Sequence, residues 1–526
     1  MNTIGIKLVS LLCITGLIAA CGSGGGTTDT DSGGGTATTS SNSLGEAYPS
    51  DLAVSSPTAS SSSSTSLNKS VDGVLTAEAT PPPITEQKQK IQNILNATSK
   101  TDCKFTFDLS ASPPAANCYG PNLNYTNHPD RSGGENPNGQ LPPGDLGIWE
   151  ENNGATSEAC VAAKMNNLVG EIITNVRIAT EMGAAILCAA NLAGLKLPDK
   201  GASVDLQSVA QSTMTDNGVP MTISTATLSR AASDATSDRP IFTMAINGAL
   251  TFSVQGQGSQ SSEFQMTLRH VPKAIDNNDT YDGRLSLQVN IPNISFGPFA
   301  LGNCSGANGL TDAFSIEYSK TSATSLTYAL KRAEFCGKDA SPFDSNKNID
   351  LSKKKSGSQA QGWGNDGNFA LFNINPEDGT GNFAYAWQAG ANDGNTRVLE
   401  VKVTKSGSAV SGCGYFGYGP DIAATSGVGS IDRMICNWAG PGNSHTGVTK
   451  AQRQCFSQSS GKMVSDSSNL AIRYAPTNAC DKTAAQNFSY ATSDNSSSVA
   501  ASENVTNNLI GLSDIDVTVP TAPSIP

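Results

Sequence analysis

The spacing of apolar residues changes along the chain, and the change predicts two kinds of secondary structure. Between Thr156 and about Ala193, apolar residues recur every three or four positions, which is the period of one face of an α-helix. After Arg239 the period becomes two. In 284–291, for example, apolar and polar residues alternate without error, as in a half-buried β-strand. The sequence therefore predicts an α+β fold in which helices precede strands.

Two helices are expected before the strands. A short one follows the prolines at 81–83, with Thr85 as its N-cap and apolar residues at 84, 91, 94 and 95. The long one ends near Gly194 and would measure about 57 Å as one rod. Because that is long for a compact domain, we expect a break near Gly183. Charged residues within it argue against a membrane span, so a buried, long or broken core helix is predicted.

The strands are expected in hairpin order. Asn-Gly and Asp-Gly pairs at 247–248, 282–283, 366–367, 378–379 and 393–394 favour tight turns, because these residues tolerate positive φ. About twelve strands with one apolar face predict a large antiparallel β-meander, curved or barrel-like, covered by the long helix. The strands are expected at about 241–246, 249–255, 263–271, 284–291, 313–320, 326–335, 368–374, 382–388, 396–404, 412–418, 430–438 and 469–475.

Residues 1–21 have the pattern of an export signal. A start with one lysine precedes an apolar run at 8–19, which is too short for a permanent membrane span. The run leads into Ile18-Ala19-Ala20-Cys21, which resembles the lipobox of bacterial lipoproteins. The resemblance implies that 1–20 is a signal peptide and that Cys21 becomes the acylated first residue of the mature chain. Because position 22 is not Asp, it also implies the outer membrane, at its periplasmic face or at the cell surface.

The rest of the chain divides by composition. Residues 21–82 are rich in Ser, Gly and Thr and poor in large apolar residues. Such a segment buries too little apolar surface to offset its conformational entropy, so we expect a disordered tether with a coil-like span of about 40–45 Å. After it we expect a mainly helical region (83–238), a first half of the β-meander (239–336), a polar loop (337–365), a second half (366–480) and a loosely ordered tail (481–526).

The charge of the chain bears on its partners. It contains 33 basic and 45 acidic residues, which gives a net charge of −12. Nucleic-acid binding needs a clustered basic face, so nucleic acid is not an expected partner. The expected partners are the membrane, through the lipid on Cys21, and a protein or a glycan.

The cysteines predict disulfides. Of the 12 cysteines, Cys13 leaves with the signal peptide and Cys21 carries lipid, so an even number, ten, remains. In an exported chain such a number indicates up to five disulfides. No Cys-x-x-Cys occurs and the chain has three histidines, so neither a metal nor a cofactor is expected. If neighbours along the chain pair, the disulfides are Cys103–Cys118, Cys160–Cys188, Cys304–Cys336, Cys436–Cys455 and Cys413–Cys480.

One loop combines residues that bind ligands or perform catalysis elsewhere. It follows an expected strand and contains Trp438, Asn443, Ser444 and His445. In a hydrolase, His445 would act as general base, Ser444 or a water as nucleophile, and an acid such as Asp432 as orienting group. Adjacent residues on a loop do not by themselves form a dyad. We therefore interpret it as a ligand-contacting loop and assign no catalytic residue.

Three other patterns have plainer interpretations. Gly-x-Gly-x-x-Gly occurs at 362–367 and 412–417, but neither motif opens a helix as dinucleotide binding requires. The segment 344–350 places Asp and Asn at alternate positions, yet it lacks the Gly and Glu of a calcium loop and favours an Asx-rich turn. The aromatic residues at 383, 385 and 387 share one face of a strand, where core packing is the commoner role.

These patterns together predict a membrane-anchored envelope or surface lipoprotein with a non-catalytic binding or structural role. One alternative is a periplasmic carrier that holds an apolar ligand in a half-barrel cavity, by analogy of fold. The other is a hydrolase centred on His445.

Overall fold

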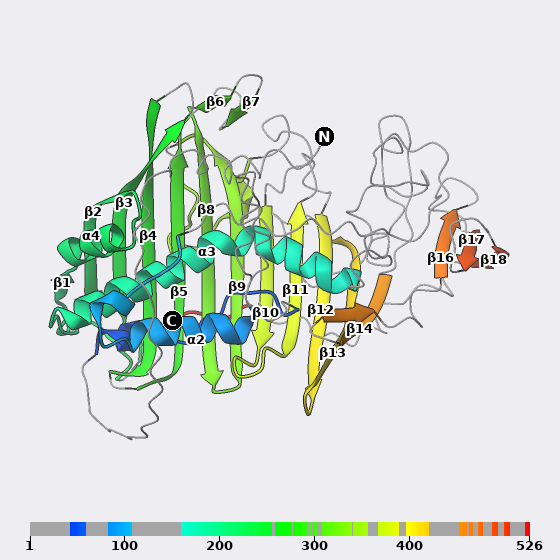
Figure 1. Cartoon of the computed structure of the whole chain (residues 1–526), viewed down its shortest axis with the longest axis horizontal. Helices are drawn as coiled ribbons and strands as arrows, with labels where there is room; N and C mark the ends of the chain where they lie inside the picture. The colour runs from blue at the N-terminus through cyan, green and yellow to red at the C-terminus, as the bar shows by residue number, and fades with distance from the viewer. Residues whose placement is uncertain are drawn as a thin grey trace, which may run out of the picture.

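The computed structural model shows an α+β fold in which helices cover one face of a large antiparallel sheet (Figure 1). It describes residues 43–58, 83–107 and most of 159–419, with gaps at 237, 255–257, 276, 293, 297–298, 302–307, 339, 356–366 and 389–395. It also describes 452–459, 462–465, 472–476, 487–492, 499–504 and 521–526.

The sheet has 13 strands, and each pairs antiparallel with its neighbours. Its strands are β1 (Ser203–Asp205), β2 (Met221–Arg230), β3 (Phe242–Val254), β4 (Gly258–Ala274), β5 (Asn277–Ile291), β8 (Leu310–Ser322), β9 (Ser325–Cys336), β10 (Gly367–Ile374), β11 (Gly381–Gln388), β12 (Thr396–Ser406), β13 (Ala409–Gly419), β14 (Gln452–Ser459) and β15 (Lys462–Ser465). The order in space follows the chain, so the predicted meander is confirmed. Its edges are β1 and β15, and the sheet is therefore open.

Shorter strands lie outside this sheet. A two-stranded ribbon, β6 (Ile294–Phe296) and β7 (Phe299–Leu301), lies between β5 and β8 in the chain. A three-stranded sheet is made of β16 (Ile472–Pro476), β17 (Asn487–Thr492) and β18 (Val499–Asn504). The strand expected at 430–438 lies outside the described residues.

Two predicted turns lie inside strands. Gly248 and Gly283 belong to β3 and β5, which are longer than expected. A Cβ on Gly248 would lie 2.9 Å from the ring of Phe264, and a Cβ on Gly283 would lie 2.3 Å from Tyr318 Oη. These glycines therefore give room to aromatic side chains of adjacent strands. The turn predicted at Gly379, with φ +75°, is confirmed between β10 and β11.

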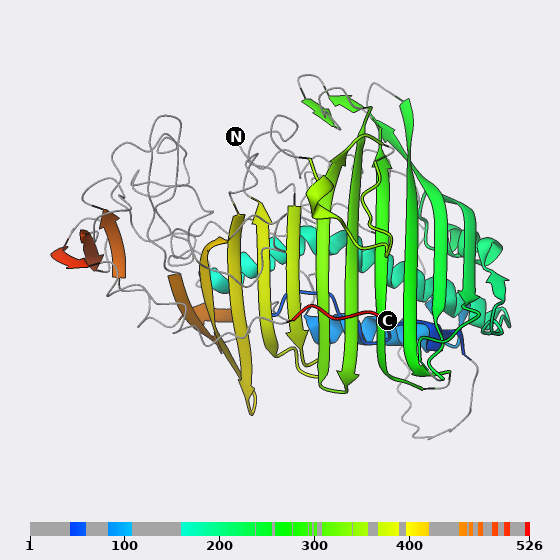
Figure 2. The same cartoon turned by 180° about the vertical axis from the view of Figure 1, so that it is seen from behind.

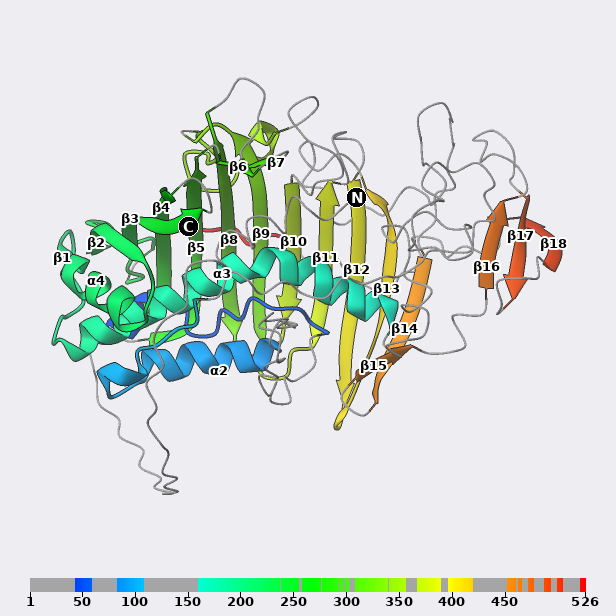
Figure 3. The same ribbon diagram turned by 45° about the horizontal axis from the view of Figure 1, so that its top comes forward.

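The long helix is unbroken. It is α3 (Cys160–Leu192), with 33 residues and a length of about 50 Å. The expected break near Gly183 was wrong, because this glycine makes room for a side chain: a Cβ there would lie 2.9 Å from the ring of Tyr48. Figures 1 and 3 show α3 crossing the strands on one face of the sheet, which we call the front face. Among the described helices, none has the combined length and apolar character of a membrane span.

The other helices flank α3. The short predicted helix is α2 (Ile84–Leu95), and its N-cap residue is Pro83 rather than Thr85. α4 (Gln207–Asp216) lies beside β2, and Gln211 Nε2 donates a hydrogen bond of 3.1 Å to the carbonyl of Met221 there. The sheet thus begins at β1, within the region expected to be mainly helical. Single 3₁₀ turns are η1 (Leu44–Ala47), η2 (Lys100–Asp102) and η5 (Leu351–Lys353).

Part of the expected tether is folded. Residues 43–58, which we call the strap, run between α3 and α2 over the front face, dark blue in Figure 3. Their large side chains at Leu44, Tyr48, Leu52 and Val54 are at most 1% exposed. The prediction of disorder was wrong here because each apolar side chain, although sparse in the sequence, reaches the core.

The back face of the sheet, which Figure 2 shows from behind, carries a smaller apolar core. Much of the predicted polar loop folds onto this face, where 343–349 form a bridged turn. Asp344 Oδ1 accepts hydrogen bonds from the amides of Asn346 (2.8 Å) and Asn348 (3.0 Å), which confirms the Asx-rich turn. The core beneath it contains Ala313, Ala329, Ala333, Phe335, Ile349, Leu351, Phe369, Leu371, Ala384 and Ala386. In the predicted tail, residues 521–526 also lie over the back face, where Arg269 Nη2 donates 2.5 Å to Pro526 O.

The disulfides differ from the predicted pairs. Cys103 pairs with Cys188 across 85 positions, and Cys413 pairs with Cys455 across 42. Both connect elements that the fold, rather than the chain order, brings together. Cys336 is disulfide-bonded too, but its expected partner Cys304 lies outside the described residues. The pairs Cys103–Cys118, Cys160–Cys188, Cys436–Cys455 and Cys413–Cys480 were therefore wrong; the unbroken α3 alone separates Cys160 from Cys188 by about 42 Å.

Candidate functional site

The strongest concentration of buried polar groups lies where the strap meets α2, α3 and the sheet. We call this cluster the clamp. It is made of Tyr48, Asp51, Gln87, Lys88, Lys90, Gln92, Glu181, His270, Asn278, Tyr281, Tyr318 and Lys320.

The carboxylate of Asp51 fixes the middle of the strap. It forms an ion pair with Lys320 of β8, and Gln92 Nε2 of α2 donates to its Oδ1 at 2.6 Å. Lys88 Nζ lies 3.8 Å from the same oxygen. The Asp51 amide donates to Tyr281 Oη at 3.3 Å, so its backbone is held as well. Both ends of the Asp51–Lys320 pair are at most 10% exposed, which makes the pair a buried one.

A second buried carboxylate lies on α3. Glu181 is fully buried, and Lys90 Nζ of α2 lies 2.7 Å from its Oε2. Gln87 Nε2 donates to Oε1 at 3.4 Å, and the amide of Thr106 donates to Oε2 at 3.3 Å. Two lysines of α2, two positions apart, thus contact carboxylates of different elements. Lys88 lies near Asp51 of the strap, and Lys90 pairs with Glu181 of α3.

A neutral histidine completes the clamp. Burial lowers the pKa of His270 to about 3, so the imidazole is uncharged at neutral pH. Asn278 Nδ2 donates to the carbonyl of Tyr48 at 2.7 Å, so the Asn278 oxygen faces the histidine. His270 Nε2 then donates to Asn278 Oδ1 at 2.8 Å, and Nδ1 accepts from Tyr318 Oη at 3.1 Å. This chain of hydrogen bonds joins β4, β5 and β8 to the backbone of the strap.

The tyrosines of the clamp are also uncharged. Burial raises the pKa of Tyr48, and the nearby Glu181 raises it further. Burial likewise raises the pKa of Tyr281 and Tyr318. Tyr48 Oη donates to Thr180 O of α3 at 2.5 Å. Because the tyrosines and His270 are buried and hydrogen-bonded, the clamp is suited to fixing a peptide segment.

The far end of the strap is fixed by α3. Ser56 Oγ donates to Asn166 Oδ1 at 2.5 Å, and Asn166 Nδ2 donates to the carbonyl of Thr58 at 3.1 Å. The buried side chain of Asn166 thus bonds both to the backbone and to a side chain of the strap. The strap is therefore held at its middle and at its end.

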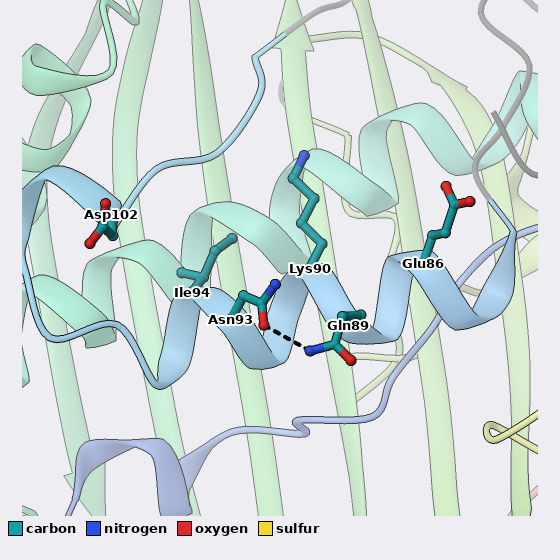
Figure 4. Close-up of a pocket in the computed structure, with 6 residues that line it drawn as sticks. All are labelled: Glu86, Gln89, Lys90, Asn93, Ile94 and Asp102. Atoms are coloured by element: carbon teal, nitrogen blue, oxygen red, sulfur yellow. Dashed lines mark hydrogen bonds between the residues drawn. The ribbon is translucent and has the colours of Figure 1, made fainter. Parts of the chain in front are cut away.

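An open hollow of about 340 Å³ lies on the outer side of α2 (Figure 4). Among its lining side chains, Gln89 Nε2 donates a hydrogen bond of 2.7 Å to Asn93 Oδ1. The ammonium of Lys90 points away to Glu181 and to Thr106. None of the polar side chains described as lining the hollow is buried, and we assign no role to it. It is lined by Glu86, Gln89, Lys90, Asn93, Ile94 and Asp102.

The sites predicted from the sequence are only partly placed. Cys21, Asp432 and the loop with Trp438, Asn443, Ser444 and His445 lie outside the described residues, so the ligand loop and the hydrolase stay predictions. The described part of the second Gly-rich motif lies in β13. A Cβ on its Gly414 would clash with the side chain of Val161, so this glycine leaves room for α3 to pack on β13.

The clamp was missed in the sequence, although two signals pointed to it. His270 continues the alternation of Phe264, Met266 and Leu268, which marks it as buried. In the strap, Leu44, Tyr48 and Leu52 recur at intervals of four within a stretch otherwise typical of a linker. Neither signal identifies a polar partner, because the partners come from elements far away in the chain.

No known family model matches this chain, and comparison with curated proteins and with solved structures finds no similar protein.

Proposed function

We propose that this protein is an exported bacterial lipoprotein, acylated at Cys21, with a non-catalytic binding or structural role at the outer membrane. The observation that carries the proposal is the strap. Its first described residue, Ser43, stands 22 positions after Cys21, and the clamp fixes the segment that follows into the core. A lipid at Cys21 would therefore be joined to the body of the fold through a firmly held segment.

The position of the strap limits the distance from the membrane. A chain of 22 residues reaches at most about 75–80 Å when fully extended. A tether that ran to residue 82, which is 61 positions after Cys21, would reach about 200–220 Å when fully extended. The greatest distance that the proposed anchor allows between the membrane and the fold is therefore much shorter than a free tether to residue 82 would allow.

The disulfides support export. Cys103–Cys188 and Cys413–Cys455 join elements far apart in the chain, and Cys336 is disulfide-bonded too. Structural disulfides form and persist in oxidising compartments such as the periplasm. They agree with the signal peptide, although they do not depend on it.

The front face gives less support to an apolar-ligand carrier. Side chains of α3, the strap and the sheet form one buried cluster there, with Tyr328, Phe372 and Phe383 at most 1% exposed. Tyr328 and Phe372 meet edge to face at 5.0 Å between ring centroids, as do Phe372 and Phe383. The strap occupies the position over the sheet that a half-barrel carrier would offer its ligand.

Metabolic labelling with a fatty-acid analogue tests the anchor. The chain expressed in a bacterial host should incorporate the label and fractionate with the outer membrane. Cys21→Ser should abolish both results, whereas the matched control Cys13→Ser, in the same segment, should change neither. Labelling that survives Cys21→Ser would refute the lipid site.

Cross-linking on intact cells tests the binding role. The anchored chain should capture one reproducible protein or glycan partner, identified by mass spectrometry after denaturing purification. A secreted Cys21→Ser chain serves as the control for captures that do not need the membrane. Turnover of ester substrates that His445→Ala abolishes would favour the hydrolase and contradict a non-catalytic role.

A further inference from the structure

The two described disulfides lie in different surroundings. Cys103 and Cys188 are 3% and 2% exposed, between the segment after α2 and the end of α3. Cys413 and Cys455 lie directly opposite each other on β13 and β14, with Cα atoms 4.0 Å apart, and both are only half-buried. Thiols in solution can therefore approach the second pair more readily than the first.

A buried carboxyl group lies next to the half-buried pair. In the register of β12 and β13, Lys402 is opposite Cys413, and Glu400 is opposite Tyr415. Directly paired residues share one face of a sheet, so Glu400 and Cys413 are diagonal neighbours on the back face. Such neighbours have Cα atoms roughly 7–8 Å apart, within reach of a long side chain.

Glu400 is buried with one carboxyl oxygen unpaired among the described residues. Its side chain is 3% exposed, and its Oε1 has no hydrogen-bond partner in the described part of the chain. On its other side, in β11, it is paired with the fully buried Ala384. Burial raises the pKa of Glu400 to about 7, so near neutral pH the group both carries and releases a proton readily.

We propose that Cys413–Cys455 is a redox-active disulfide that exchanges with external thiols, and that Glu400 supplies the proton to Cys413 when the disulfide opens. The proposal goes beyond the lipoprotein function and does not rest on it. A structural disulfide would need neither the half-exposed position nor the buried acid beside it.

The reaction balances with two thiols as the reductant. A thiolate attacks Cys455 Sγ, the S–S bond breaks, and its electron pair goes to Cys413 Sγ, which takes the proton of Glu400. A second thiolate attacks the outer sulfur of the mixed disulfide and releases Cys455 as a thiolate, which takes up a proton from water. Glu400 regains its proton from the solvent. In sum, one protein disulfide and two thiols give two protein thiols and one external disulfide.

Reduction would act on the end of the sheet. β14 carries the edge strand β15, and Met463 O of β15 accepts a 2.6 Å hydrogen bond from Ala159 N at the start of α3. Opening the disulfide removes the cross-link between β13 and β14, and β14 is the strand that pairs with this edge. The same edge contacts the N-terminal end of α3, so reduction of the disulfide would loosen the support for this end of the helix on the front face.

Mapping reduction by glutathione tests the proposal. The purified, oxidised chain is incubated with reduced glutathione, quenched with an alkylating reagent, and digested for mass spectrometry. Cys413–Cys455 should open at least about tenfold faster than Cys103–Cys188, with the glutathione adduct on Cys455. Glu400→Gln should slow the opening of Cys413–Cys455 about tenfold at pH 7 and leave Cys103–Cys188 unchanged. The slowing should diminish as the pH rises above 7.

The matched control is Glu263→Gln, which removes an exposed carboxylate of β4 on the same sheet. This variant should open at the wild-type rate. Equal rates for the two disulfides in the wild-type chain, or an adduct on Cys413, would overturn the proposal without any variant. Slowing by Glu263→Gln as large as by Glu400→Gln would overturn the role of Glu400.

Discussion

The two faces of the sheet differ in whether their buried charged or ionisable groups have partners. On the front face, the charged groups of the clamp are paired: two lysines of α2 and Lys320 face the carboxylates of Asp51 and Glu181. On the back face, Glu400 is buried beside alanines with Oε1 unpaired in the described part of the chain. The difference indicates that the front face is built to hold the strap, whereas the back face buries a carboxyl group without a partner among the described side chains.

The comparison also concerns what covers each face. The front cover comes from the strap, α2 and α3, which all precede the sheet in the chain. Most of the described back cover comes from 340–355, an excursion between two strands of the sheet itself, and residues 521–526 add to it. Losing a front contact should therefore affect the whole fold, while losing a back contact should stay local. Four experiments test this contrast.

Removal of the strap carboxylate should have the largest effect. Asp51→Ala leaves Lys320, which is 10% exposed, without its partner in a buried site. We expect the free energy of unfolding in urea to fall by about 3–5 kcal/mol. Asp216→Ala, which breaks the exposed pair with Lys100, serves as the control and should change little. A small loss from Asp51→Ala would mean that the clamp does not hold the fold together.

Acid should weaken the front face through His270. Its pKa is about 3 when folded and near 6.5 when unfolded, so the unfolded chain binds the proton more strongly. The contribution is complete above pH 6.5 and is lost, by up to about 1.4 kcal/mol per unit, as the pH falls from 6.5 toward 3. Unfolding measured between pH 7 and 4 should show a shallower slope for His270→Gln than for the wild-type chain. Identical slopes would contradict a buried neutral imidazole.

Glu400 should act with the opposite sign. Its folded pKa of about 7 exceeds its ordinary value, so its contribution is complete below about pH 4.5 and is lost as the pH rises through 7. Glu400→Met should therefore stabilise the chain at pH 8, by up to about 3 kcal/mol, and have little effect at pH 4.5. Thermal unfolding at the two pH values measures the difference. A destabilised variant at pH 8 would indicate a stabilising partner for this carboxylate.

The smallest effect is expected in the cover of the back face. Asn348 Oδ1 accepts from Ser315 Oγ at 2.9 Å, and its Nδ2 donates to Glu317 Oε2 at 3.0 Å. Asn348→Ala should cost about 1–2 kcal/mol, with faster hydrogen exchange confined to 343–349. Asn346→Ala, whose side chain is exposed, is the control. Faster exchange spread into α3 would contradict the local character of the back cover.

Much of the sheet could be predicted from the sequence, because each strand shows its buried face by alternation alone. The same alternation, in β11, correctly placed Phe383, Tyr385 and Trp387 in the core. The turns predicted at Gly248 and Gly283 were wrong because an Asx-Gly pair occurs in two contexts. It forms tight turns, and it also occurs within a strand where the glycine leaves room for an aromatic ring of the next strand.

The strap and the clamp could not be predicted, for a different reason. The composition around Tyr48 is that of a linker, and its burial depends on Gly183, 135 positions away in the chain. The predicted disulfide pairs were wrong for the same reason, because Cys103 and Cys188 come together only when α2 and α3 pack against each other. Local pattern predicts elements, but contacts between distant elements need the fold.

Because α3 is unbroken, its length has to match the width of the sheet that it covers. Strands lie about 4.8 Å apart, so a helix of about 50 Å laid across them matches about ten strands. A hairpin added to the middle of the sheet would widen it by about 10 Å and leave apolar side chains without cover. We therefore expect natural or engineered variants to gain or lose a hairpin only together with about six residues of helix. The length of α3 would then limit the number of strands in the sheet.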